Sequence, residues 1–110
     1  MSGQDFPESD WKLLRKVYEA AFDRFCRDSL KKAEAVIDEQ ALTPSDRFEK
    51  LSKFIKSQNK DLNSIFYTFN FSHSNAIMIL SILYNWELVT PDELNQFNPS
   101  IQSRIKGGIE

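Results

Sequence analysis

The sequence predicts an all-α protein, folded as a small helical bundle. The 110-residue chain has no glycine between Gly3 and Gly107, although tight hairpin turns and phosphate-binding loops depend on glycine. Each of the three internal prolines follows a residue type that caps helix N-termini. Because proline is favoured at the first helical position, each of these pairs marks the start of a helix: Thr43-Pro44, Thr90-Pro91 and Asn98-Pro99.

Length and composition predict one domain over residues 1–110, with residues 1–7 and 107–110 expected to be disordered. The single cysteine, Cys26, excludes an internal disulfide framework and favours a reducing compartment. The N-terminus lacks the pattern of a secretory signal, and the most apolar stretch, 76–83, is too short to cross a bilayer. We therefore expect a cytoplasmic protein that does not bind membranes.

The first helix is expected over residues 9–40. Apolar side chains at three- and four-residue steps place one face of it against the core: Trp11, Leu14, Tyr18, Ala21, Phe22, Phe25, Ala33 and Val36. A second apolar line, formed by Leu13, Val17 and Ala20, lies on the other side of the helix. A helix that buries two faces is either central in its own fold or shared with another chain.

The length of this helix adds to the second alternative. A helix of about 31 residues is about 46 Å long, whereas a compact domain of this size is roughly 34 Å across. Either the helix breaks near Asp28-Ser29 or the molecule is elongated. An elongated molecule with a second apolar line favours pairing, so we expect a homodimer whose contact includes Leu13, Val17 and Ala20.

The second helix is expected over residues 44–69, with Thr43 as N-cap, and should form an antiparallel hairpin with the first. The apolar phase continues through the polar run 56–61, which favours one unbroken helix. Its apolar residues fall on one arc, and three lysines fall on the opposite arc: Lys53, Lys56 and Lys60.

A third helix is expected over residues 73–87, capped by Ser72 or Ser74. It is apolar on all sides between Ala76 and Tyr84, which predicts the buried centre of the bundle. Thr90 and Glu93 have the spacing of a capping box, so one or two short helices should follow and end at Gly107-Gly108.

No catalytic or metal-binding constellation is visible. The lone histidine, His73, has no carboxylate within ten residues, and Cys26 is expected to act as a small apolar side chain in mid-helix. The helical carboxylates Glu19, Asp23, Glu34 and Asp38 lie off the apolar stripe and lack the Glu-x-x-His spacing of a di-metal centre. We therefore expect no enzyme, no metal and no cofactor.

These expectations favour a non-catalytic protein–protein interaction module, of the adaptor, regulatory or immunity type, that also self-associates. One alternative is a nucleic-acid-associated regulator that contacts phosphates through Lys53, Lys56 and Lys60. The net charge of −2 and a sequence pI near 5.4 disfavour it. Another alternative is a binder of a small apolar ligand between the helices.

Overall fold

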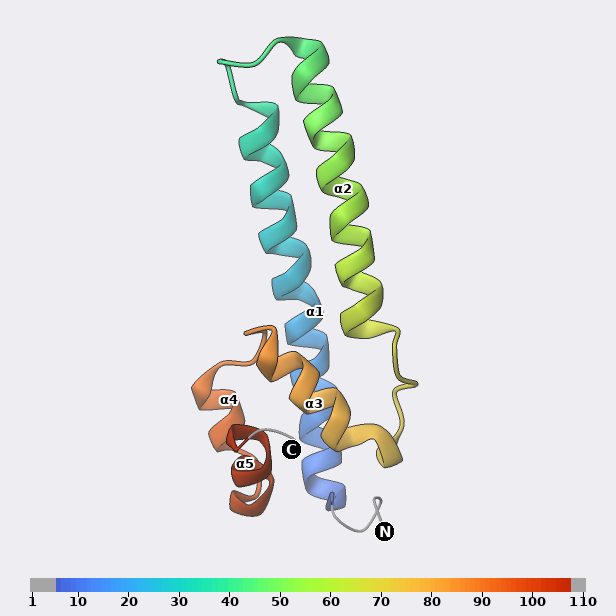
Figure 1. Cartoon of the computed structure of the whole chain (residues 1–110). Helices are drawn as coiled ribbons and strands as arrows, with labels where there is room; N and C mark the ends of the chain where they lie inside the picture. Colours follow the sequence, from blue (N-terminus) through green and yellow to red (C-terminus); the bar gives the residue numbers. More distant parts are fainter. Residues whose placement is uncertain (1–5, 108–110) are drawn as a thin grey trace.

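The computed structural model describes residues 6–107, and within this range the chain is all-α as predicted, with no strand. The helices are α1 (Glu8–Ile37), α2 (Pro44–Phe66), the 3-10 turn η2 (His73–Asn75), α3 (Ala76–Asn85), α4 (Pro91–Asn95) and α5 (Pro99–Lys106). Helices α1 and α2 form a long antiparallel hairpin, and α3, α4 and α5 gather beside the N-terminal half of α1 (Figure 1).

Helix α1 is unbroken through Asp28 and Ser29, so the molecule is elongated, with extents of 55 × 25 × 25 Å. It ends at Ile37 rather than at the expected residue 40, where the side chain of Arg47 donates a hydrogen bond to the Ile37 carbonyl at 2.9 Å. This bond satisfies one of the carbonyls that a helix C-terminus leaves without a partner in the helix.

Helix α2 is one helix through the polar run 56–61, as predicted, and Thr43 caps it by accepting the Asp46 N–H at 3.2 Å. It ends at Phe66, three residues before the expected end. There the Thr68 hydroxyl donates to the Ser64 carbonyl at 2.7 Å, taking an acceptor that a continuing helix would have used.

The core lies at the base of the hairpin, where α1 meets the C-terminal helices. The residues that are almost completely buried come from α1, α3, α4, α5, the segment before α1 and the connection between α4 and α5: Phe6, Leu14, Leu80, Leu83, Leu94, Phe97 and Ile101. Phe6 lies in the N-terminal segment expected to be disordered, and that expectation is wrong at this residue because its ring is fully buried. Residues 1–5 and 108–110 of the segments expected to be disordered lie outside the described residues.

Helix α3 is not buried on all sides, which corrects the prediction that it is the centre of the bundle. Ile79, Leu80 and Leu83 are buried, whereas Ile77 and Ile82 are half-buried and Met78 is exposed. The helix packs against α1, α5 and η2. Because these neighbours leave one side uncovered, α3 covers the base of α1 as an outer layer.

The end of α3 is a Schellman motif made without glycine. Glu87 adopts φ 60°, the left-handed conformation that usually calls for glycine. The Leu88 N–H donates to the Leu83 carbonyl at 2.9 Å, and the Glu87 N–H donates to the Tyr84 carbonyl at 3.0 Å. The motif reverses the chain direction and points the Leu88 carbonyl toward α1.

Candidate functional site

The outer half of the hairpin has almost no core of its own. Beyond the C-terminal helices, the buried residues of α1 are Ala33 and Val36. The buried residues of α2 are Ile65 and Phe66, which lie at its C-terminal end near the base, so no residue from Pro44 to Ser64 is buried. Two helices with one thin contact layer leave much of their apolar surface in water.

Four large apolar side chains on the outer hairpin are exposed. The exposed fraction is 65% for Leu30 and 51% for Ile37 on α1, and 72% for Phe48 and 44% for Ile55 on α2. A single exposed apolar residue is common on a protein surface. A group of large ones marks a contact surface.

These four side chains lie on one side of the hairpin. Ile37 and Phe48 line a single hollow of 220 Å³ together with Pro44, Arg47 and Leu51. Leu30 precedes Ile37 by seven residues and Ile55 follows Phe48 by seven, which is about two helical turns. Each therefore shares the side of its neighbour. Cys26 precedes Leu30 by four residues, about one helical turn, and lies on the same side. We call Cys26, Leu30, Ile37, Phe48 and Ile55 the hairpin face.

The hairpin face continues toward the base through a second hollow of 350 Å³, lined by Tyr18, Glu19, Phe22, Asp23 and Cys26. Cys26, which was expected to act as a small apolar side chain in mid-helix, is exposed here. Below it, the Tyr18 hydroxyl donates to the Phe66 carbonyl at 3.0 Å. Burial, and then the nearby Tyr67 hydroxyl, raise the pKa of Tyr18.

The opposite side of the hairpin is charged. A groove of 470 Å³ lies between α1, α2 and the end of α3, and most of its lining residues are charged or polar. Its cations come from α1 and are interleaved with carboxylates: Arg24, Arg27, Lys31 and Lys32 alternate with Asp28, Asp61 and Glu87. Lys32 pairs with Asp28 at 3.0 Å, and Arg27 pairs with Asp23. The groove has mixed charge and is not a basic surface.

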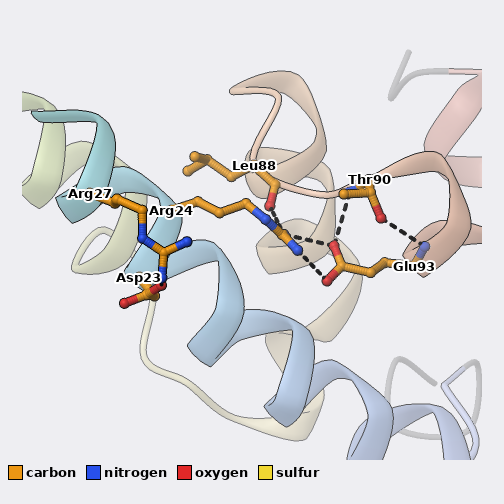
Figure 2. A network of polar contacts seen from close by, with 6 residues as sticks. All are labelled: Asp23, Arg24, Arg27, Leu88, Thr90 and Glu93. Atoms are coloured by element: carbon orange, nitrogen blue, oxygen red, sulfur yellow. Dashed lines mark hydrogen bonds and ion pairs between the residues drawn. The ribbon is translucent and has the colours of Figure 1, made fainter. Parts of the chain in front are cut away.

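Arg24 fastens the C-terminal helices to α1 from this side (Figure 2). Its guanidinium donates to both carboxylate oxygens of Glu93 at 2.7 and 2.6 Å, and also to the Leu88 carbonyl at 2.7 Å. Glu93 is held in turn by a capping box with Thr90, whose N–H donates to the carboxylate at 2.9 Å. The Thr90 hydroxyl accepts the Glu93 N–H at 3.0 Å.

The electrostatics of this clamp follow from its geometry. Partial burial alone raises the pKa of the Glu93 carboxyl, but the hydrogen bonds and charge of Arg24, together with the bonds from Thr90, outweigh it and leave the pKa below its usual value. The hydrogen bond to Glu93 raises the pKa of Arg24. Both groups are therefore charged at neutral pH, and the clamp holds the end of α3 and the start of α4 against α1.

The residues of the predicted dimer contact pack against other parts of the same chain. Val17 is 3% exposed and belongs to the core cluster with residues of α3 and α5, while Leu13 and Ala20 are half-buried. This second line makes α1 central in its own fold, which was one of the two alternatives. It therefore has little surface to offer to another chain.

The structure does not bring the other residues singled out in the sequence together into one site. Lys53, Lys56 and Lys60 are exposed on α2, and Lys53 pairs with Glu49 at 3.4 Å. His73 stacks on Trp11 with ring centroids 5.1 Å apart, and its Nε2 contacts the Phe6 carbonyl, so it fastens the N-terminal segment to η2.

The exposure of the hairpin face could not be read from the periodicity of α2, since Phe48 and Ile55 share the arc of the buried Ile65. One signal was available: α2 has 23 residues and is about 35 Å long, which is more than short C-terminal helices can cover.

Among the described residues, no group of three or more His, Cys, Asp or Glu side chains is placed to hold a metal ion. In residues 6–107, no helix combines the length and the apolar character needed to span a membrane. No known protein family, curated protein or solved structure matches this chain.

Proposed function

We propose that this chain is a non-catalytic protein-binding module of the adaptor or regulatory type, and that it binds its partner through the hairpin face. The single observation that carries the proposal is that a hairpin without a core of its own exposes Leu30, Ile37, Phe48 and Ile55 on one side. Burying apolar surface on a partner releases about 25 cal/mol for each Å², and no segment within residues 6–107 covers these side chains.

The rest of the molecule supports this role as a rigid base. Aromatic contacts hold the connection between α2 and α3 on α1, with Phe71 stacked on Trp11 at 4.8 Å. The Arg24–Glu93 pair holds α4 on the other side. Because both contacts lie on the inner part of α1, the hairpin projects from a fixed platform and presents its face in one orientation.

The nucleic-acid alternative has less support. The lysines of α2 are dispersed along the helix, and the cations in the charged groove alternate with carboxylates. Phosphate binding gains from several cations that are free to replace released counterions, and neither surface offers such a cluster. The apolar-ligand alternative lacks support for a related reason, since the apolar hollows of 220 and 350 Å³ are parts of a surface that runs along the hairpin.

The proposal is tested by comparing the complexes that the chain forms in cells that make it. One variant combines Leu30→Lys with Phe48→Glu, which places charge on the hairpin face. Its matched control combines Ala35→Lys with Ser57→Glu at two exposed positions away from that face. Cross-linking in the cells, followed by mass spectrometry, measures which complexes contain the chain.

We expect the face variant to lose its complexes and the control to keep them, with circular dichroism showing that both are folded. A face variant that keeps every complex of the wild type would contradict the proposal. Loss in both variants would contradict it as well, because binding would then depend on surface charge in general.

A further inference from the structure

We propose that the partner on the hairpin face is a second copy of this chain, placed so that α1 of each copy lies over α2 of the other. This inference rests on the proposed function and names the occupant of its surface. Two hairpins stacked face to face form a four-helix bundle, the arrangement in which two-helix layers cover their apolar sides. The dimer contact is then the hairpin face and not the line through Val17.

The pairing of helices within one hairpin sets which residues would meet. Ser29 on α1 is hydrogen-bonded to Gln58 on α2, and Ile37 shares a hollow with Phe48. The same antiparallel register places Leu30 at the height of Ile55 along the hairpin, and Glu34 at the height of Ser52. If a two-fold axis runs along the hairpin, each residue of α1 stands over the partner's residue at its own level. Ile37 would then pack on the partner's Phe48.

The charges beside the hairpin face favour this axis over the alternative. Next to the apolar side chains, α1 carries the carboxylates Glu19, Asp23 and Glu34, whereas α2 carries the uncharged Ser52 and Asn59 four residues after Phe48 and Ile55. With α1 over α2, the acidic edge of each copy meets the uncharged edge of the other. A two-fold axis perpendicular to the hairpin would set α1 over α1 and bring the acidic edges together, which is unfavourable.

The size of the surface suits a second hairpin. Between Tyr18 and Ile37, α1 rises about 28 Å, and two helices side by side are about 20 Å wide. The flat outline is therefore about 560 Å², and the accessible area of its side chains is larger because they stand out from it. This matches the roughly 800 Å² that each partner contributes to a specific interface. The C-terminal helices lie beside the inner part of α1 and leave the outer hairpin open (Figure 1).

Sedimentation velocity over a concentration series tests self-association. We expect the purified full chain to form a dimer as concentration rises through the micromolar range. Phe48→Glu should weaken the dimer at least about tenfold, since large aromatic anchors dominate such contacts. The matched control, Ser57→Glu, lies at an exposed position on the charged side of α2 and should leave it unchanged.

A wild-type chain that stays monomeric at hundreds of micromolar would overturn the second-copy proposal. It would not overturn the proposed function, which is tested separately by the cellular complexes of the face variant and its control. Equal dimer strength in Phe48→Glu and the wild type would also overturn the proposal, because the contact would then lie elsewhere.

Thiol cross-linking tests the arrangement. In a Cys26→Ser background, one preparation carries Glu34→Cys and another carries Ser52→Cys, both at exposed positions. A short thiol-reactive cross-linker should join the chains in a mixture of the two preparations and join neither preparation to itself. If the protein is dimeric but the mixture gives no more cross-linked product than the separate preparations, the placement of α1 over α2 is wrong.

Discussion

Arg24 and Glu93 are 69 residues apart in the sequence, and their side chains form a two-pronged ion pair with nitrogen–oxygen distances of 2.7 and 2.6 Å. The same guanidinium bonds the Leu88 carbonyl, which the left-handed Glu87 residue aims at α1. One side chain of α1 thus holds both the end of α3 and the start of α4.

Replacing Arg24 with alanine should lower the free energy of unfolding by about 2 kcal/mol, because it leaves the half-buried Glu93 carboxylate and the Leu88 carbonyl without their donor. Arg27→Ala is the matched control, since Arg27 forms an exposed pair with Asp23 one turn away and should cost less than about 0.5 kcal/mol. Urea unfolding followed by circular dichroism measures both. Equal losses in the two variants would show that the Arg24 contacts add nothing to stability.

The clamp makes stability depend on pH in the acid range. The pKa of Glu93 in the folded chain lies below its ordinary value of 4.5, so the unfolded chain binds the proton more readily. The stabilisation is therefore present in full above the ordinary value and is lost as the pH falls through the folded-state pKa. The wild type should unfold at higher urea than Glu93→Gln at pH 7, and the difference should shrink in acid. A difference that stays constant or grows in acid would contradict this assignment.

Glu87→Gly should stabilise the protein by about 1 kcal/mol. Glu87 holds the left-handed conformation at φ 60°, which costs a side-chain-bearing residue roughly 1–2 kcal/mol and costs glycine little. Glu87→Ala is the control, because alanine keeps the Cβ atom and should gain nothing. Thermal unfolding of the three proteins measures the effect, and an equal melting temperature for Gly and Ala would show that the backbone at this position is not strained.

Amide hydrogen exchange should divide the hairpin into a protected base and a less protected outer part. Around Leu14 and Ala21, α1 is covered by the core, whereas further out its buried residues are Ala33 and Val36. In dilute protein we expect amides of residues 30–37 to exchange faster than those of residues 14–21, because local opening exposes little apolar surface there. Raising the protein concentration should slow exchange in the outer part if a second copy covers it. Uniform protection along α1 in dilute protein would contradict this division.

Local signals in the sequence located the helices well. Thr43, Thr90 and Asn98 each accept a backbone N–H at the start of the helix predicted there. These contacts join residues two or three apart, so they form wherever the local order of residues allows them. The absence of glycine predicted the all-α fold class but did not locate every turn. Glu87 takes a left-handed conformation that glycine would adopt more readily.

The helix ends were predicted less well than the starts. The ends of α1 and α2 depend on Arg47 bonding the Ile37 carbonyl and on Thr68 bonding the Ser64 carbonyl. Helix α3 looked buried on all sides because its composition is apolar throughout, but burial depends on how many neighbours surround it. Helices α1 and α5 and the turn η2 cover one side of α3, so Met78 remains exposed.

The sequence by itself determined the helical class, the helix starts and the apolar phase of each helix, because these depend on residues within one or two turns. Only the tertiary structure decided which apolar side chains are covered. Ile55 and Ile65 share one arc of α2, yet Ile65 is buried at the base and Ile55 is exposed on the outer hairpin. The physical reason is that α3, α4 and α5 are too short to extend along the whole hairpin. Which part of the hairpin they cover depends on where the chain folds back and not on any local pattern.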